Sequence, residues 1–178
     1  MPTLRKSLIA ATVALLVGAT TVATQSNVSA APAAPPPTYG IQHLNTQVDL
    51  PPGTWTDTPL EVVLPRAGTY ELDANVRGRL SGVPPLNTYI TARLWDVNSG
   101  TAVPQSERLV HQIIDYNAGN AEAGGNETAP ISEQIRVNGP AIIRLQGLRT
   151  DALGAATIAQ IYSDNSGYTS LRYERVGP

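Results

Sequence analysis

Cysteine and phenylalanine are both absent from this chain of 178 residues. Without cysteine the chain has no disulfide bond and no thiolate that could hold a metal ion. A folded domain of this sequence must therefore rely on its apolar core and its backbone hydrogen bonds. Metal centres and cofactors that need cysteine ligands are therefore excluded, and we expect no cofactor.

Lysine occurs once, at Lys6, within a segment that has the pattern of a secretory signal. Arg5 and Lys6 precede an apolar run over residues 8–17, and the small residues Val28-Ser29-Ala30 follow. This order predicts a signal peptide over residues 1–30 that is cleaved after Ala30. Since the apolar run is far shorter than the roughly 20 residues of a membrane-spanning helix, we expect export without membrane insertion.

Removing that segment takes away Arg5 and Lys6, which leaves ten arginines against fourteen acidic residues. A chain of this charge is a poor partner for nucleic acid or for anionic lipid. Arginine as the mature cation, together with much alanine, valine and proline, is typical of a GC-rich bacterial genome. We therefore expect a secreted, extracellular bacterial protein.

No segment keeps a helical period over eleven residues, whereas strand signals recur about every ten residues between Gly, Pro, Asn and Asp. This pattern predicts one all-β domain over residues 39–178, an antiparallel sandwich or barrel, after a proline-rich spacer over residues 31–38. The polar stretch from Asp115 to Thr128 predicts a long solvated loop or a binding loop. The expected strands are 40–50, 60–64, 68–80, 87–97, 107–114, 131–137, 141–148, 155–163 and 168–176.

Alternation along two neighbouring strands separates a core face from an outer face. The predicted core comprises Tyr70, Leu72, Val76, Ile90, Leu94, Ile135, Ile143, Leu145 and Leu171. The outer face of the strand 87–97 carries Tyr89, Thr91, Arg93 and Trp95. Tyr89 and Trp95 are candidates for a contact with another subunit or with a ligand, and the alternative is a pair of surface aromatics covered by a neighbouring loop.

Three segments resemble a known family. The run Pro65-Arg-Ala-Gly68-Thr-Tyr70-Glu-Leu72-Asp-Ala74-Asn-Val76 resembles the central strand entry of C1q/TNF-like jelly rolls, and residues 139–145 and 163–173 resemble later strands. The resemblance covers residues 55–176 and implies a ten-stranded antiparallel jelly-roll β-sandwich, a trimer, and recognition rather than catalysis. The chain departs from the family in its lack of phenylalanine and of a collagen-like stalk, so a distant bacterial or phage-type relative is expected.

The segment 155–163 predicts where subunits meet. Ala156 and Ile158 lie on one face of the expected strand, and Ala155, Ala159 and Ile161 lie on the other. A strand that is apolar on both faces is covered on both. Because a two-layer sandwich covers only one face of each sheet, Ala155, Ala159 and Ile161 are predicted to form a subunit interface.

No constellation of residues supports catalysis. Ser106 and His111 are five residues apart on an expected strand and point to opposite faces, so they do not form a triad with Asp115. Glu71 and Asp73 are alternate carboxylates on a solvated strand face. Residues 164–167 resemble part of a calcium loop but also fit a hairpin turn, which we favour.

These observations predict a secreted, non-catalytic binding or structural module that self-associates as a trimer. Its ligand would be a protein or a glycan, which the sequence does not identify. The alternative is an extracellular carbohydrate-binding or carbohydrate-cleaving sandwich, in which Trp55, Tyr89 and Trp95 stack on sugar rings.

Overall fold

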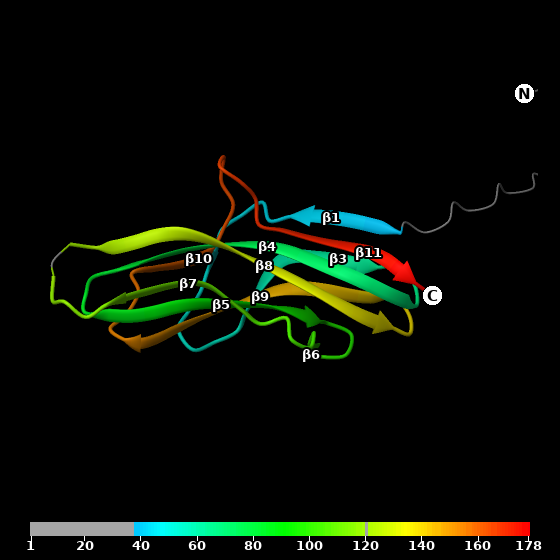
Figure 1. Ribbon diagram of the computed structural model, residues 1–178, viewed down its shortest axis with the longest axis horizontal. Coiled ribbons are helices and arrows are strands. Elements are labelled where there is room, and N and C mark those ends of the chain that lie inside the picture. Colours follow the sequence, from blue (N-terminus) through cyan, green and yellow to red (C-terminus); the bar gives the residue numbers. More distant parts are fainter. Residues whose placement is uncertain (1–37, 120) are drawn as a thin grey trace, which may run out of the picture. The chain divides into compact units, whose positions relative to one another are not determined.

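The structure is a computed structural model that describes residues 38–119 and 121–178. The predicted signal peptide and residues 31–37 of the spacer lie outside the described residues. The described chain folds into strands joined by turns and loops (Figure 1). The strands are β1 (Tyr39–His43), β2 (Val48–Asp49), β3 (Thr56–Leu64), β4 (Gly68–Gly82), β5 (Leu86–Asp96), β6 (Thr101–Ala102), β7 (Arg108–Asp115), β8 (Ala123–Val137), β9 (Ala141–Leu153), β10 (Ile158–Ile161) and β11 (Ser170–Gly177).

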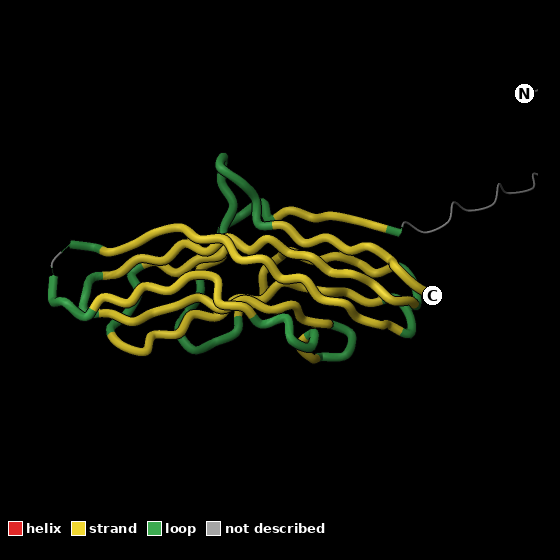
Figure 2. Tube along the Cα trace, in the orientation of Figure 1, coloured by secondary structure: helices red, strands yellow, loops and turns green. Residues whose placement is uncertain are grey.

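Two antiparallel sheets form the domain, and we call them the β4 sheet and the β5 sheet (Figure 2). In the β4 sheet, β8 pairs with one edge of β4, and β11 and β10 pair with successive parts of its other edge. Further out, β1 pairs with β11 and β2 pairs with β10. In the β5 sheet the order is β3-β9-β5, with β7 and β6 on successive parts of the last strand. Most connections change sheet, as they do in a jelly roll.

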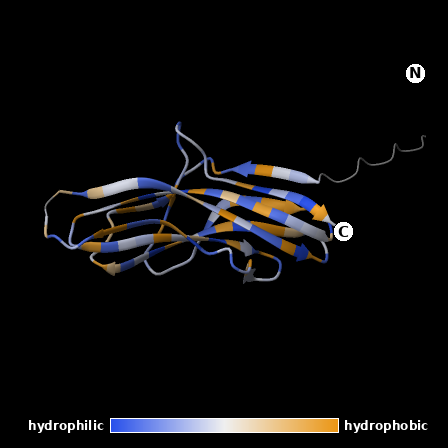
Figure 3. Cartoon of the chain, viewed as in Figure 1, coloured by the Kyte–Doolittle hydropathy of each residue, from blue (hydrophilic) through white to orange (hydrophobic). Residues whose placement is uncertain are grey.

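The core lies between the two sheets, as the alternation of the sequence predicts. Figure 3 shows hydrophilic and hydrophobic residues alternating along the strands. On β4, Tyr70, Leu72 and Val76 are fully buried, whereas Glu71 and Asn75 between them are exposed. The predicted core residues are all buried, except that Ile135 is only partly buried against the same cluster. The all-β sandwich expected from the sequence is therefore confirmed.

Two boundaries differ from the expectation. β8 begins at Ala123, so the predicted loop from Asp115 to Thr128 shrinks to the residues between β7 and β8. The reason is that β4 is 15 residues long and offers backbone partners along its whole length, so even Gly124 and Gly125 join its ladder. Favourable hydrogen bonding to a long neighbour outweighs the low strand propensity of glycine.

The expected strand 155–163 is also shorter, because β10 spans only four residues. Its inward side chains, Ala159 and Ile161, belong to the domain's own core. A Cβ on Gly147 would lie 2.6 Å from Cδ1 of Ile161, so the absence of a side chain there lets Ile161 pack closely against β9.

Among the described residues, no helix is long and apolar enough to span a membrane.

Candidate functional site

Two tryptophans and one arginine lie together on the outer face of the β5 sheet. The guanidinium carbon of Arg93 lies 3.9 Å from the centroid of the Trp55 ring and 4.8 Å from that of the Trp95 ring. Both distances are within the range of a cation–π interaction. Arg93 and Trp95 are on β5, whereas Trp55 immediately precedes β3. We call this outer surface the tryptophan face.

Strand alternation explains why these side chains share one surface. On β5, Leu86, Ile90 and Leu94 point into the core, so the odd-numbered Tyr89, Arg93 and Trp95 point outward. Tyr89, Arg93 and Trp95 are half-buried. The sequence prediction for Tyr89 and Trp95 therefore places both on the correct face, and no described segment encloses them fully.

A polar network fixes Arg93 in place. Its Nε donates to Oε1 of Gln146 over 2.8 Å, and Nε2 of Gln146 donates to Oδ1 of Asp57 over 2.6 Å. The other carboxylate oxygen of Asp57 accepts a hydrogen bond from Arg144, which also pairs with Glu61. Because each link is set by the pairing of β3 with β9 and of β9 with β5, the sheet orients the guanidinium.

Two arginine pKa values in this network shift in opposite directions. Burial lowers the pKa of Arg93, and the nearby Glu107 and Asp57 carboxylates offset part of that effect. Burial also acts against the charged form of Arg144, but its hydrogen bonds and ion pairs with Glu61 and Asp57 raise its pKa overall. Both side chains stay charged at neutral pH. Arg93 is thus a partly desolvated cation. The charge of Arg144, in contrast, is balanced by the carboxylates of Glu61 and Asp57.

An apolar strip lies beside the tryptophan–arginine cluster on the same face. It consists of Tyr89, Leu109, Ile114 and Leu148, with Gln112 between Leu109 and Ile114 on β7, and we call it the β7 strip. Leu109 and Ile114 are each 54% exposed, and Leu148 is half-buried. Leu109 and Leu148 flank Thr91 from β7 and β9. The sequence pattern misses this strip, because the alternation of β7 shifts register next to Val110, where β7 carries an irregularity.

The residues predicted to form a subunit interface are not an open surface. Ala159 and Ile161 are buried in the core, and Ala155 lies exposed before β10 begins. The physical reason is that the inner face of β10 covers the β5 sheet, while β4 and β2 pair with its two edges. These three residues therefore do not form one patch, and self-association itself stays a prediction.

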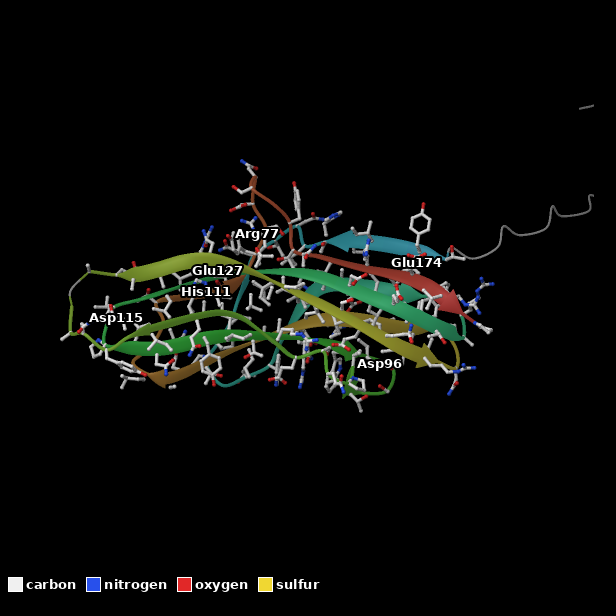
Figure 4. The ribbon with its side chains drawn as sticks, in the orientation of Figure 1. Arg77, Asp96, His111, Asp115, Glu127 and Glu174 are labelled. Carbon is white, nitrogen blue, oxygen red and sulfur yellow. The ribbon has the colours of Figure 1, made fainter. Side chains whose placement is uncertain are left out.

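The residues weighed for catalysis are not brought together. Ser106 is buried, and its Oγ donates to the carbonyl of Val103 over 2.7 Å and accepts from the amide of Leu94 over 3.0 Å. His111 lies in the body of the sandwich, whereas Asp115 lies at its loop end (Figure 4). Among the described residues, no group of three or more histidine, aspartate or glutamate side chains could hold a metal ion.

The other two candidate motifs have structural partners. Residues 164–167 form a hairpin turn, since the backbones of Asp164 and Gly167 exchange two hydrogen bonds. The Asp164 carboxylate accepts hydrogen bonds from Arg77 over 2.6 Å and from the amide of Ser166 over 2.8 Å, and its pKa is lowered chiefly by Arg77. Asp73 accepts from Ser132 over 2.7 Å and from Arg172 over 3.0 Å on the outer face of the β4 sheet. Both carboxylates are thus engaged by neighbouring donors.

Comparison with known proteins shows only distant similarity. The sequence matches no family model, and no curated protein matches it. The Eiger TNF from S. frugiperda is 12% identical over 78% of this chain and 91% of its own, with a TM-score of 0.43. A structure of the infectious bursal disease virus Gt strain is 16% identical over 78% of this chain, with a TM-score of 0.40. A VP2 subviral particle of that virus gives 14% identity over the same share of this chain and a TM-score of 0.37.

This chain spans just over a third of each of the two virus chains, 37% in both cases. One of these structures is a TNF protein, which belongs to the family that three segments of the sequence resemble. All three TM-scores are below 0.5, so these matches say nothing about ligand, assembly or activity. The class of the protein rests on its own strand order, which is that of an antiparallel jelly-roll sandwich.

Proposed function

We propose that this chain is a secreted, non-catalytic binding module that recognises polysaccharide outside the cell through its tryptophan face. The observation that carries the proposal is the gathering of Trp55, Arg93 and Trp95 on one open sheet face. Aromatic rings in such a position offer flat, apolar surface with a polar edge, and this suits the face of a sugar ring. Of the two functions that the sequence suggests, the proposal favours glycan binding. The subunit interface predicted at β10 is not supported, because its inward residues lie in the core.

Rigidity of the face supports a binding role. The indole rings are held by Arg93, which Gln146 anchors to β9, so little conformational freedom is left to lose when a ligand binds. A glycosidase needs two carboxyl groups that act on a bound sugar from opposite sides. Asp57 and Glu61 are instead both engaged by Arg144. A module that binds without cleaving fits this arrangement better than a glycosidase.

Retention on immobilised polysaccharides tests the proposal. The protein recovered from culture supernatant should be retarded in native gels that contain polysaccharide, and Trp95→Ala should abolish that retardation. Tyr39→Ala is the matched control, because Tyr39 is an exposed aromatic on β1 of the other sheet. If no polysaccharide retards the folded protein, or if both variants behave alike, the proposal is wrong. Incubation with the same polysaccharides should release no reducing ends.

Self-association as a trimer is a second candidate, and the β7 strip favours it. Exposed Leu109 and Ile114 beside Tyr89 give an apolar area of the kind that subunit contacts use. Light scattering after size-exclusion chromatography should give three times the protomer mass at tens of micromolar. Leu109→Arg should then yield monomers, whereas Val63→Arg, at an equally exposed site on β3, should leave the trimer intact. A monomeric unmodified protein would contradict this candidate.

A further inference from the structure

Arg93 differs from most arginines of the domain in having no carboxylate partner. Six arginines of the described chain lie within 4.0 Å of an Asp or Glu oxygen, namely Arg77, Arg79, Arg108, Arg144, Arg149 and Arg172. For Arg93 the described residues supply one hydrogen-bond acceptor, Gln146, which takes the Nε proton. Its two terminal nitrogens have no acceptor among those residues. They form an unused pair of parallel donors beside two indole rings.

The position of this charge carries a cost that a ligand could remove. Burial lowers the pKa of Arg93, which means that the surrounding protein desolvates the guanidinium. The indole rings offset part of that loss, but they do not occupy its N–H groups. A planar guanidinium with two free donors matches a carboxylate, which it binds through two parallel charge-assisted hydrogen bonds.

We propose that the ligand of the tryptophan face is an acidic polysaccharide, in which Arg93 takes the carboxylate of a uronic acid while Trp55 and Trp95 contact the sugar rings. This inference rests on the proposed function and names its ligand class. A sugar ring that bears a carboxylate presents both required features within one residue. An acidic peptide offers the charge alone, without a rigid ring to match the indoles.

The neighbouring charges define how such a ligand would be recognised. Asp57 and Glu61 are both paired with Arg144, and Glu107 is exposed nearby, so the three carboxylates outnumber the two arginines of the face. The face as a whole does not attract anions over a distance. Recognition therefore depends on the short-range contact with Arg93, and the affinity should fall only weakly with salt, by much less than it does for a polyanion-binding groove.

Two ligands with the same sugar chain, one with free carboxylates and one with methyl esters, test this inference. Isothermal titration of the secreted protein should show binding of a galacturonic acid hexasaccharide at least about tenfold tighter than binding of its fully methyl-esterified form. Arg93→Gln should abolish this preference, so that the variant binds acid and ester equally. Binding of the ester should weaken far less than binding of the acid, because for the ester only the positioning of the indole rings is lost. Arg136→Gln is the control, because Arg136 is an exposed arginine on β8 of the other sheet.

The outcomes separate the two proposals. If acid and ester bind equally and Arg93→Gln changes neither, the assignment of an acidic ligand is wrong while the proposed function stands. If the folded protein binds neither, nor any neutral polysaccharide, both proposals fail. Equal binding of poly-L-glutamate would mean that charge alone is recognised, which overturns the assignment of a saccharide. Melting curves of each variant exclude loss of folding as the cause.

Discussion

Arg93 and Gln146 face each other across β5 and β9, and a hydrogen bond of 2.8 Å joins Nε of the arginine to Oε1 of the glutamine. The amide of Gln146 also donates to Asp57 over 2.6 Å. Gln146 is thus an acceptor towards one side and a donor towards the other, a role that neither a carboxylate nor an apolar side chain can fill. The orientation of Arg93 depends on this neutral amide.

Gln146→Glu tests that dependence with hardly any change of shape. The new carboxylate would face the Asp57 carboxylate where an N–H donor now lies, and it would also pair with Arg93 and compete with an acidic ligand. We expect the free energy of unfolding to fall by about 1–3 kcal/mol and binding of galacturonic acid oligomers to weaken. Urea unfolding and calorimetry measure the two effects. Gln42→Glu, at an exposed site on β1 of the other sheet, should change neither.

Leu94→Ala tests the assignment of the core. Leu94 lies on β5 with no exposed surface, between two outward residues of the tryptophan face. Removing its side chain should lower the free energy of unfolding by about 2–5 kcal/mol, because the packed sheets cannot fully close the cavity. Val63→Ala, at an exposed site on β3, is the control and should cost less than about 0.5 kcal/mol. Similar losses of stability for both variants would show that the core is assigned incorrectly.

Ile161→Glu and Ile158→Glu separate the two faces of β10. Ile161 is fully buried, so a carboxylate there would lose its hydration without gaining a partner, and we expect the domain to unfold or to be recovered in poor yield. Ile158 is 38% exposed on the opposite face, and its substitution should be tolerated. Circular dichroism of the two variants decides the matter. A folded Ile161→Glu protein would show that Ile161 lies at the surface, and would contradict its assignment to the core.

The contrast at β10 shows how far the sequence predicts this molecule. Alternation places Leu72 and Leu94 in the core and Tyr89 and Trp95 outside, because period-two patterning follows directly from strand geometry. The same pattern is ambiguous for Ala159 and Ile161. The burial of Ile161 depends on a distant glycine, Gly147, which has no side chain at the point where the two sheets approach closely. No local pattern carries that information.

The candidate site was predicted only in part for a similar reason. The aromatic residues on β5 could be found from alternation, and Trp55 could be named as a surface aromatic. Their meeting at Arg93 could not be predicted, because it depends on the register between β3, β9 and β5. That register shifts between Asp57 and Glu61, which brings both carboxylates to Arg144. Such pairing is a property of the folded sheet alone.

Acid should destabilise the domain through Asp151. Although burial acts against its charged form, hydrogen bonds from Arg149, Thr88 and the amide of Ala156 lower its pKa overall. A carboxyl group with a depressed pKa in the folded state contributes stability above its unfolded pKa of about 3.9, and this contribution is lost as the pH falls towards its folded value. Thermal unfolding between pH 2 and pH 6 (roughly the range in which carboxyl groups titrate) should therefore show a smaller decrease for Asp151→Asn than for the unmodified protein. Parallel curves would contradict this.

Intrinsic tryptophan fluorescence tests the central claim most directly, because the chain contains only two tryptophans and both lie on the tryptophan face. A ligand that binds there changes the surroundings of both indoles, whereas a ligand that binds elsewhere leaves them as they are. Titration of the purified protein with galacturonic acid oligomers should give a saturable change in emission, which Arg93→Gln weakens and Arg136→Gln preserves. An emission spectrum that stays constant while calorimetry detects binding would show that the ligand binds elsewhere, and would contradict the account.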